Sequence, residues 1–491
     1  MKLDKLVRDA LGLRLSLPEV DVTRVVQDTR MIEPGFPFVF VARRGRDFDG
    51  HRFASRAIAL GAVAVVGSAS PEERQTFPWL YAVPYIYVED DRLAVAKLSA
   101  TLFGQPSQQL FTVGVTGTDG KTTTSYLLEH LLAGVHPVGL LSTAGTRIAG
   151  REVNLPGHFT TPEAPEVQEL LSRCVAAGCT HAVIESSSHG FALERLAEVD
   201  YDVGVWTNLT PEHLDFHGTF GAYREAKGEL MARARLSILN FDDPEFDYFA
   251  ARAAQVVSYG LGDGAEWRAT DIEEHSGHLV WVLERRGARF AAELPMIGRY
   301  NVSNALAALA AAAAAGVSIG VSLRRLATFP GVPGRMQVVQ GSPFAVVVDF
   351  AHTPPALTKA LLAVKPQVSG RLIVVIGAAG ERDPGKRQPL GENAVRHADF
   401  AIFTEEDSRS EDGGAILAQL AAGAEGAGGQ PERDFTLIPD RHEAIRRAVE
   451  LAEVGDVVLL AGKGHERTLE RQDAVLEWDE VAEARAALGM R

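Results

Sequence analysis

The sequence predicts an α/β protein of three domains, and three observations support this. The chain has 491 residues, of which 46% are hydrophobic, and a chain of that length typically divides among several cores. Apolar runs that end in glycine or polar residues alternate with helical stretches, a pattern typical of parallel sheets with crossover helices. A segment rich in proline and glycine, FPGVPGRMQ at residues 329–337, separates two such series and predicts a domain hinge.

The first domain is expected to span residues 1–105. Its apolar runs are short and are separated by glycine-containing turns such as Asp49-Gly50, which predicts a small α/β unit. These runs lie at residues 36–42, 61–67 and 85–90.

The second domain is expected to span residues 106–332. A β-rich run at residues 111–117, FTVGVTG, leads directly into the helical stretch KTTTSYLLEHLLAG, and further apolar runs follow at residues 181–186, 202–209 and 236–243. Continuous apolar runs of this kind predict buried parallel strands. Apolar and polar residues alternate in GHLVWVLERR, which predicts antiparallel strands within residues 245–295. A helix is expected from Asn301 to Ala315.

The third domain is expected to span residues 333–491. Each of its apolar runs ends in a polar or glycine-containing loop, and functional groups of open α/β sheets gather at such carboxyl ends. The runs lie at residues 344–352, 371–380, 399–407 and 456–466. The alanine- and glycine-rich stretch from Ala421 to Gly429 is expected to be a surface loop.

Composition excludes several classes of protein. The formal net charge of -15 argues against a nucleic-acid partner, because nucleic acids are bound by clustered lysine and arginine. Two cysteines, Cys174 and Cys179, cannot build a four-thiolate zinc site and fit a reducing, cytoplasmic location. The N-terminal MKLDKLVRDALGLRL lacks the apolar stretch of a signal peptide, and no window of ~20 residues is apolar and uncharged. No membrane insertion is therefore expected.

The segment from Thr116 to Thr122, TGTDGKT, predicts a phosphate-binding loop because it follows a strand and opens a helix. Its glycines let backbone N–H groups face phosphate oxygens, and the helix N-terminus adds partial positive charge. Lys121 would reach the outer phosphates, and the Thr122 hydroxyl would bind Mg²⁺. The match is partial, since Val115 stands where the strict pattern has glycine. A merely structural glycine-rich turn is the less favoured interpretation.

Two more polar clusters follow apolar strands. Glu185, at the start of ESSSH, could hold a Mg²⁺ that bridges the γ-phosphate, or the serines could simply cap the next helix. The segment TNLTPEHLDFHG places two histidines, His213 and His217, and two acids within six positions, which favours a metal or acid/base cluster. Lys227 lies on an expected helix and, taken alone, would be interpreted as a solvated lysine.

These segments occur in one order with GRYNVSNALAA, GVPGRMQ, VVDFAHTPPAL, GAAGERDPGKR and AGKGHE, and together they resemble the Mur ligases that add the third residue of the peptidoglycan stem peptide. The resemblance extends from Asp28 to Glu466. It implies a UDP-binding domain, an ATPase domain and a Rossmann-like C-terminal domain. It also implies an ATP-dependent acid–amino-acid ligase, acting as a monomer through an acyl phosphate and forming ADP and phosphate. The implied substrates are UDP-N-acetylmuramoyl-L-alanyl-D-glutamate and a free diamino acid.

The resemblance also implies site residues. Lys121, Lys227 and His213 match catalytic positions, and Lys227 matches a lysine that is carbamylated to N6-carboxylysine in the family. Metal positions are Thr122, Glu185, His213 and the carbamylated Lys227. ATP positions are Gly117, Thr118, Asp119, Gly120, Lys121, Thr122, Thr123, Asn301, Asn304, Arg335, Asp349 and His352. Uridine positions are Asp28, Thr29 and Arg30, and muramoyl-dipeptide positions are Thr160, Thr161, Ser187, Ser188 and Arg195. Amino-acid positions are Arg382, Asp407, Arg409, Gly462 and Glu466.

The third amino acid stays open at this point. Diaminopimelate-adding members carry Asp-Asn-Pro-Arg where this chain has Glu406-Asp407-Ser408-Arg409. The arginine suits a carboxylate, either that of the meso-diaminopimelate side chain or the α-carboxylate of any amino acid. The flanking acids suit the cationic side chain of L-lysine or L-ornithine, or are simply a solvated loop. Leu193 also replaces a glutamine found near the dipeptide site of some members.

Two other functions are alternatives. A folylpolyglutamate synthase-like ligase would share the ATP-binding domain, but residues 1–105 speak against it. A Mur-like subunit of an amidotransferase complex usually carries four zinc-binding cysteines, which this chain does not have.

Overall fold

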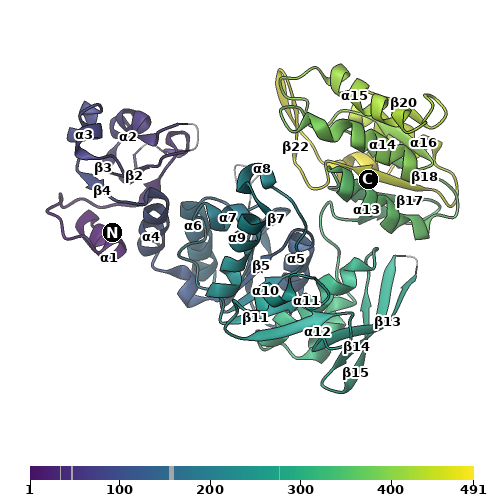
Figure 1. The fold of residues 1–491 in the computed structure, drawn as a ribbon, viewed down its shortest axis with the longest axis horizontal. Helices are drawn as coiled ribbons and strands as arrows, with labels where there is room; N and C mark the ends of the chain where they lie inside the picture. Colours follow the sequence, from purple (N-terminus) through teal and green to yellow (C-terminus); the bar gives the residue numbers. More distant parts are fainter. Residues whose placement is uncertain (34, 46–47, 154–159, 276, 491) are drawn as a thin grey trace. The chain divides into compact units, whose positions relative to one another are not determined.

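The structure is a computed structural model, and it describes residues 1–33, 35–45, 48–153, 160–275 and 277–490. The chain forms two compact units (Figure 1). The first contains Met1–Arg268 and Ser303–Arg325, and the second contains Ala269–Val302 and Leu326–Arg491. The boundaries of the three predicted domains remain predictions. The chain leaves the first unit at Arg325 and enters the second at Leu326, shortly before the predicted hinge at residues 329–337.

The first unit begins with a four-stranded parallel sheet in the order β1-β2-β3-β4. Leu6 of helix α1 and Leu98 of helix α4 pack with Val39 and Val41 on one face. Ala57 of helix α2 packs on the other face with Phe38 and Phe40. The predicted α/β unit is confirmed. Its elements are α1 (Leu3–Leu11), β1 (Arg24–Val26), η1 (Thr29–Met31), β2 (Phe38–Ala42), η2 (Gly50–Phe53), α2 (Ala54–Ala59), β3 (Ala62–Gly67), α3 (Pro71–Arg74), η3 (Pro78–Tyr81), β4 (Tyr85–Tyr87) and α4 (Asp91–Leu102).

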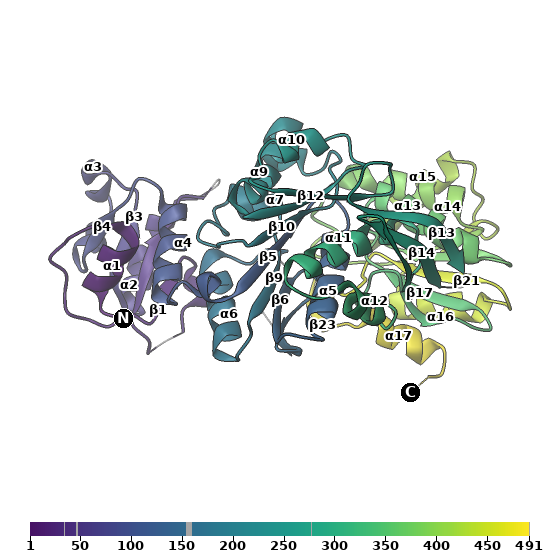
Figure 2. The same cartoon turned by 90° about the horizontal axis from the view of Figure 1, so that it is seen from below.

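The larger sheet of this unit has the strand order β12-β11-β10-β5-β9-β6-β7-β8, and it is parallel as far as β6. Strands β7 and β8 add an antiparallel edge. Figure 2 shows helices α5 and α11 close to one another beside these strands. The elements up to β9 are η4 (Pro106–Gln109), β5 (Phe111–Thr116), α5 (Lys121–Leu132), β6 (Val138–Ser142), β7 (Gly145–Ile148), β8 (Arg151–Val153), α6 (Ala164–Ala176) and β9 (His181–Glu185). The others are α7 (Ser188–Ala192), β10 (Val203–Trp206), α8 (Leu214–His217), α9 (Phe220–Arg233), β11 (Leu236–Asn240), α10 (Phe246–Ala250), β12 (Val256–Gly260), α11 (Tyr300–Ala314) and α12 (Ile319–Leu326).

Strand order explains how this sheet assembles a site. Strand β5 lies between β9 and β10, and all three are parallel. Their carboxyl ends therefore meet at one edge of the sheet. Residues that are far apart in the sequence lie at these three ends: Gly117 directly follows β5, Glu185 is the last residue of β9, and Thr207 directly follows β10.

The second unit contains an antiparallel hairpin and a six-stranded sheet. In the hairpin, β14 pairs with β15, which confirms the antiparallel excursion predicted for residues 245–295. The sheet has the order β16-β17-β21-β18-β19-β20 and is parallel except for β16. Its strands are β16 (Gln337–Gln340), β17 (Ala345–Asp349), β18 (Leu372–Ile376), β19 (Phe400–Phe403), β20 (Phe435–Leu437) and β21 (Val457–Ala461), with β13 (Trp267–His275), β14 (His278–Arg285), β15 (Ala288–Leu294), β22 (Thr468–Arg471) and β23 (Ala474–Glu477) outside it.

Two groups of helices cover the two faces of the six-stranded sheet. Leu361, Leu390 and Leu420 pack on one face, and Ile445 and Ala484 pack on the other. This Rossmann-like arrangement confirms the α/β fold expected for the C-terminal part. The helices are α13 (Pro354–Val364), η5 (Lys365–Gln367), η6 (Pro384–Lys386), α14 (Arg387–His397), α15 (Gly413–Gly426), α16 (Arg441–Leu451) and α17 (Glu480–Ala487).

The prediction of a surface loop from Ala421 to Gly429 is wrong, because helix α15 runs from Gly413 to Gly426. Its small residues face helix α14. A Cβ atom at Gly423 would overlap the Gln388 carbonyl oxygen, and one at Gly391 would overlap that of Leu420. Glycine and alanine here permit close helix–helix contact, so their abundance marks a buried helix face and not a loop.

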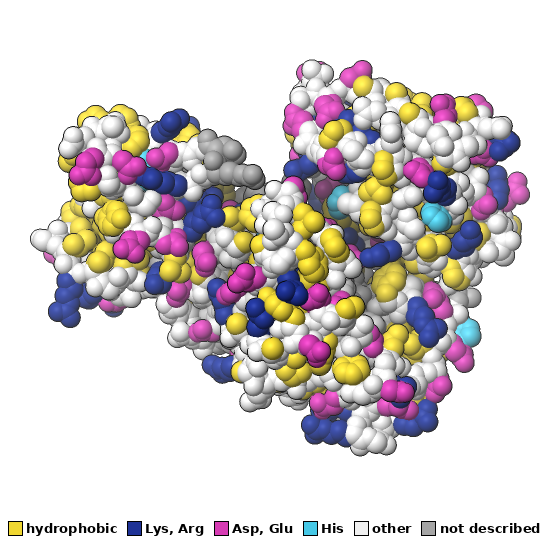
Figure 3. Space-filling model, in the orientation of Figure 1, with side chains coloured by type: hydrophobic (Ala, Val, Ile, Leu, Met, Phe, Trp, Pro, Cys, Tyr) yellow, Lys and Arg dark blue, Asp and Glu magenta, His cyan; other side chains and the backbone are white. Residues whose placement is uncertain are grey.

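Among the described residues, no helix is both long enough and apolar enough to cross a bilayer. Both cysteines are buried, and no disulfide joins them. On the face shown in Figure 3, acidic and basic side chains are interspersed.

Candidate functional site

The predicted phosphate loop connects strand β5 to helix α5, as its sequence requires. Gly117 has φ +148°, and a Cβ atom there would overlap the Thr207 hydroxyl. Gly120 has φ +83°, and a Cβ atom there would overlap Asn304 Oδ1. Lys121 bends back over the loop and donates to the carbonyl oxygens of Gly117 (3.0 Å) and Thr118 (2.8 Å). The loop therefore depends on glycine, and its cation lies where a phosphate chain would bind.

Residues after strand β10 hold the loop in place, and the sequence did not single them out. Thr207 donates to the Asp119 carbonyl oxygen (2.6 Å), and Asn208 Oδ1 accepts from the Asp119 N–H (2.9 Å). The Thr118 hydroxyl lies 3.0 Å from the Tyr223 hydroxyl. Thr207 and Asn208 begin the TNLTPEHLDFHG segment, so the segment was recognised but the role of its first two residues was missed.

Glu185 ends strand β9 beside the predicted metal residue Thr122. Its buried carboxylate accepts hydrogen bonds from the hydroxyls of Thr122 (3.0 Å) and Ser142 (2.6 Å) and from the N–H of Thr143 (3.0 Å). A hydroxyl and a carboxylate are the hard oxygen ligands that suit Mg²⁺, which commonly keeps several waters and uses one or two carboxylates with substrate phosphates. Thr122 and Glu185 therefore fit the implied ion.

His213 is placed differently from Glu185. It has φ +54°, its side chain is 47% exposed, and its ring lies 4.7 Å from that of His189. Burial lowers its pKa, the negative charge of Glu212 opposes this, and the positive charges of Lys121 and Lys227 lower it further. A lowered pKa favours the neutral ring, which is the form that binds a metal. Across the part of the chain that the structure describes, however, no three His, Cys, Asp or Glu side chains form a group that could hold a metal.

Lys227 is fully buried on helix α9, so its interpretation as a solvated lysine is wrong. Its Nζ donates to the Gly117 carbonyl oxygen (2.5 Å) and lies 4.6 Å from the centre of the Tyr223 ring. Burial holds its pKa well below the ordinary value, and the nearby charge of Lys121 adds to this effect. A substantial neutral amine fraction is what reaction with CO₂ requires.

The predicted dipeptide residues lie together near this edge. The Thr161 hydroxyl lies 2.9 Å from that of Ser187, and Arg195 donates to the Thr161 carbonyl oxygen (2.9 Å). Ser187 also caps helix α7 by accepting from the Gly190 N–H, which confirms that a serine here caps the next helix. Ser188 is buried, and its hydroxyl lies 3.1 Å from His217 Nε2. Thr160 is half-buried.

Glu163 is a further residue that the sequence did not reveal. Its carboxylate accepts from Arg195 (2.6 Å), Arg43 (3.1 Å) and Gln27 (2.8 Å). Gln27 directly precedes the predicted uridine residues. There, Asp28 pairs with Arg30 (2.6 Å), which lowers the pKa of the aspartate, and Thr29 is buried. No local pattern identifies Glu163, because its partners are over a hundred positions distant or in another segment.

The second unit holds four of the predicted ATP residues. The guanidinium of Arg335 lies 4.6 Å from the centre of the Phe350 ring. Asp349 accepts from the N–H groups of Met336 (2.7 Å) and Ala351 (2.9 Å), and burial raises its pKa. His352 Nδ1 donates to the Phe350 carbonyl oxygen (2.8 Å), and burial lowers the pKa of this histidine. The fourth residue, Asn301, donates to Ile297 (2.8 Å).

Two glycine-containing segments of this unit cross one another. A Cβ atom at Gly334 would overlap the backbone of Gly464 and His465. The segments GVPGRMQ and AGKGHE therefore meet backbone to backbone, with no space for a side chain at the crossing.

The predicted amino-acid residues form an ion-pair network around Lys463, a buried lysine that the sequence did not reveal. Lys463 pairs with Asp407 (2.8 Å) and Glu466 (2.6 Å). Arg409 pairs with Glu470 (2.8 Å) and donates to the Gly380 carbonyl oxygen (2.7 Å). Gly462 has φ +104°, and Arg382 is exposed.

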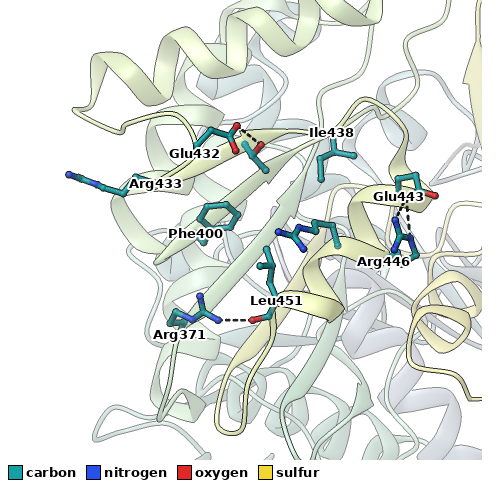
Figure 4. A pocket seen from close by; sticks show the side chains of 10 residues that line it. Arg371, Phe400, Glu432, Arg433, Ile438, Glu443, Arg446 and Leu451 are labelled. Carbon is teal, nitrogen blue, oxygen red and sulfur yellow. Dashed lines mark hydrogen bonds and ion pairs between the residues drawn. The ribbon is translucent and has the colours of Figure 1, made fainter.

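A cavity of about 430 Å³ lies elsewhere in this unit, between strand β19 and helix α16 (Figure 4). Phe400 and Leu451 line it together with Arg371 and Arg446, and the arginines are already paired with Asp456 and Glu443. None of the predicted site residues lines it, so it is separate from the candidate site.

The chain is similar to known proteins along most of its length. Three family models match the chain: "Mur ligase family, catalytic domain" at residues 22–101, "Mur ligase middle domain" at 115–312 and "Mur ligase, glutamate ligase domain" at 334–464. A UDP-N-acetylmuramyl-tripeptide synthetase of Deinococcus radiodurans is 50% identical over 98% of this chain and 99% of its own length. A UDP-N-acetylmuramoyl-L-alanyl-D-glutamate–2,6-diaminopimelate ligase of Geobacillus thermodenitrificans is 40% identical over 96% of each chain.

Solved structures show the same fold. A structure of a UDP-N-acetylmuramoyl-L-alanyl-D-glutamate–2,6-diaminopimelate ligase matches with a TM-score of 0.68 at 30% identity, and the match covers 100% of this chain and 99% of that one. A folylpolyglutamate synthase of Mycobacterium tuberculosis shares the fold at 17% identity and a TM-score of 0.62, over 80% of this chain and 94% of its own. The chain therefore belongs to the Mur ligase family of ATP-dependent ligases that form amide bonds.

Proposed function

We propose that this ligase adds a diamino acid to UDP-N-acetylmuramoyl-L-alanyl-D-glutamate in peptidoglycan precursor synthesis. The observation that carries the proposal is the pairing of Thr122 with Glu185 beneath Lys121, in a chain that matches tripeptide synthetases over nearly its whole length. The free thiols of Cys174 and Cys179 suit action in the reducing cytoplasm, and we propose a monomer.

The reaction needs an activated carboxyl group, because a carboxylate is a poor electrophile. A carboxylate oxygen of the dipeptide attacks the γ-phosphorus of ATP, ADP leaves, and an acyl phosphate forms. The amine of the diamino acid then attacks the acyl carbon, phosphate leaves, and the amine loses a proton. Lys121 and the N-terminus of helix α5 stabilise the negative charge of the transferring phosphoryl group, largely through positioning and electrostatics.

Thr122 and Glu185 are proposed to hold Mg²⁺, with His213 and a carboxylated Lys227 completing a second position. When bound, the ion supplies charge neutralisation between the phosphates. Lys227 supports the proposal because it is buried, has a lowered pKa and contacts the phosphate loop at Gly117. Asn304 and the second unit's Asn301, Arg335, Asp349 and His352 are proposed as nucleotide contacts.

The function is tested by phosphate release together with the mass of the product. ATP, the UDP-dipeptide and a diamino acid should all be required, and the product should be the UDP-tripeptide. Lys121→Ala should lower turnover by about 10²–10³-fold, because a charge-stabilising group is lost at the reacting phosphate. Exposed Lys5→Ala is the matched control and should keep normal turnover. Near-normal turnover in Lys121→Ala would reject the assignment.

The modification of Lys227 has its own test. In ¹³C-labelled bicarbonate, the wild-type enzyme should show a carbamate signal that is missing from Lys227→Arg, and the variant should lose ligation. An active Lys227→Arg enzyme, or a wild-type enzyme without the signal, would reject the modification while leaving the ligase function standing.

Neither alternative function gains support. Residues 1–105 contain the four-stranded sheet β1–β4, where the N-terminal family model matches. In a folylpolyglutamate-type ligase these residues would have no evident role. Two cysteines still cannot provide the zinc site expected of an amidotransferase partner.

A further inference from the structure

Tyr223 lies among the predicted catalytic residues, but no step of the proposed reaction involves it. It belongs to helix α9, and its side chain is fully buried. Its ring centre lies 4.6 Å from Lys227 Nζ, 5.3 Å from the ring centre of His217 and 6.4 Å from that of His213. Any role of Tyr223 that acts through Lys121 and Lys227 rests on the proposed function, in which these lysines serve ATP and Mg²⁺.

The hydrogen bonds of Thr118 give the direction of its bond with Tyr223. Thr118 Oγ1 donates to the Thr210 carbonyl oxygen (3.1 Å) and accepts from the Thr210 N–H (2.9 Å). A threonine hydroxyl has one donor and two acceptor positions. The arrangement that satisfies every group therefore has the Tyr223 hydroxyl donating to Thr118, 3.0 Å away. The Thr118 hydroxyl then has no free proton to give to a phosphate, and its role is to hold the loop.

The backbone of Thr118 extends this restraint to Lys121. Its carbonyl oxygen accepts from Lys121 Nζ (2.8 Å), and its N–H donates to the Asn208 carbonyl oxygen (2.9 Å). A shift of Thr118 would therefore move a group that fixes the Lys121 ammonium. Because hydrogen bonds joined in a chain support one another, loss of the Tyr223 hydroxyl should affect the position of Lys121.

The ring of Tyr223 contacts the other lysine. Lys227 lies four positions further along helix α9, and residues at that spacing share one face of a helix. Its Nζ lies 4.6 Å from the ring centre and donates to the Gly117 carbonyl oxygen (2.5 Å), which also accepts from Lys121 (3.0 Å). An aromatic face attracts a cation within about 6 Å of its centre. The ring therefore offsets part of the cost of burying this amine beside Lys121.

We propose that Tyr223 is a positioning residue with two separable functions. Its hydroxyl fixes the phosphate loop for ATP through Thr118, and its ring holds Lys227 where the amine reacts with CO₂. In that reaction the Nζ lone pair bonds to the carbon of CO₂, one C=O electron pair moves onto oxygen, and one proton passes to the solvent. The two functions belong to different parts of one side chain, so different substitutions can separate them.

The first test removes only the hydroxyl. In Tyr223→Phe the KM for ATP, measured by phosphate release, should rise about 3–10-fold, the factor that corresponds to one hydrogen bond, while the KM for the UDP-dipeptide stays unchanged. A variant that was merely less stable would lose active enzyme without this selective change in KM. Tyr85→Phe is the matched control. It removes a tyrosine hydroxyl that is hydrogen-bonded to Ala69 and His51 in the four-stranded sheet, and it should leave the KM for ATP unchanged.

A double-mutant cycle tests whether the hydroxyl acts through Thr118. Thr118→Val removes the acceptor and should raise the KM for ATP by itself. Adding Tyr223→Phe should then raise it by less than about twofold more, because the bond is already lost. Additive effects of the two substitutions, or a wild-type KM for ATP in Tyr223→Phe, would overturn the role of the hydroxyl.

The last test removes the ring as well. In ¹³C-labelled bicarbonate, the carbamate signal of Lys227 should persist in Tyr223→Phe and fall to less than about half in Tyr223→Leu. Equal signals in these two variants, or a wild-type enzyme without the signal, would overturn the role of the ring. Loss of the signal from Tyr223→Phe would do the same, even if Tyr223→Leu does not fold. A wild-type enzyme that ligates no diamino acid would instead overturn the proposed function.

Discussion

The phosphate loop of the first unit and the amino-acid loops of the second are stabilised in different ways. Around Gly117 and Gly120 the backbone forms the site, and Lys121 binds backbone carbonyl groups. Around Asp407 and Arg409, charged side chains form it through ion pairs with Lys463 and Glu470. The backbone site is the one proposed to bind the phosphate chain, which every ATP-dependent ligase of this family needs. A side-chain site can change its selectivity with a few substitutions, so it carries little recognisable sequence pattern.

The largest expected effect breaks the backbone site. Gly117→Ala places a Cβ atom against the Thr207 hydroxyl at a φ of +148°, so the loop must shift. Phosphate release should fall about 10³-fold, comparable with losing a preorganised charge-stabilising group. A Cβ atom at Gly221 on helix α9 would lie 3.9 Å from the Thr219 hydroxyl, an ordinary contact, so Gly221→Ala should keep activity. Comparable activity in the two variants would show that the loop tolerates side chains.

The next effect concerns ion pairs in the second unit. Arg441 and Glu480 are both fully buried and 2.5 Å apart. Arg441→Met leaves a buried carboxylate unpaired and should lower the free energy of unfolding by about 3–5 kcal/mol. Adding Glu480→Gln should recover part of the loss. Urea denaturation followed by tryptophan fluorescence includes a local reporter among the five tryptophans, because the Trp478 indole donates to Glu480 (2.7 Å). An unchanged midpoint in Arg441→Met would contradict a structural role for the pair.

A smaller effect is expected at the start of strand β9, at the opposite end from Glu185. Burial, and then the neighbouring His136, lower the pKa of His181 to about 4. The unfolded chain therefore binds a proton here first as pH falls. The resulting stability is complete above pH ~6.5 and declines toward pH 4 by at most about 3 kcal/mol. His181→Gln should reduce this slope, whereas exposed His275→Gln should not. Equal slopes in all three proteins would refute the prediction.

The helix pair α14–α15 tests the framework that supports the amino-acid loops. Gly423→Ala directs a methyl group at the Gln388 carbonyl oxygen and should cost about 1–3 kcal/mol of stability by overpacking. Gly426→Ala, at the end of the same helix, meets no atom within 4 Å and should be neutral or stabilising. Thermal unfolding separates the two, and equal melting temperatures would show that the helices can move apart.

The smallest expected effect tests whether the ion pairs of Glu163 in the first unit support binding of the UDP-dipeptide. Glu163→Gln removes the charge that pairs with Arg195 and Arg43. The KM for the UDP-dipeptide should rise about tenfold, equivalent to ~1.4 kcal/mol, with kcat nearly unchanged. Exposed Glu169→Gln on helix α6 is the control. A fall in kcat without a change in KM would assign Glu163 a different role.

The sequence predicted the parts of the molecule whose physics is local. The strands could be recognised as apolar runs. The phosphate loop could be recognised because its glycine, Lys121 and Thr122 must be consecutive in the sequence. The closeness of Glu185 to Thr122 follows from strand order, which the sequence alone does not specify. Lys227 and Lys463 were not identifiable from their surroundings, since lysine is usually solvated and only the fold shows their burial. Composition alone also could not distinguish a loop from the buried helix face at Ala421.

The crossing of Gly334 and Gly464 limits how this enzyme can be redesigned. Selection from a library randomised at these two positions should return glycine alone, although neighbouring codons vary. A specificity segment grafted from a relative should therefore bring both GVPGRMQ-type and AGKGHE-type stretches together. Replacing only one of the two stretches would change the distance between the two backbones, and the crossing leaves no space for such a change.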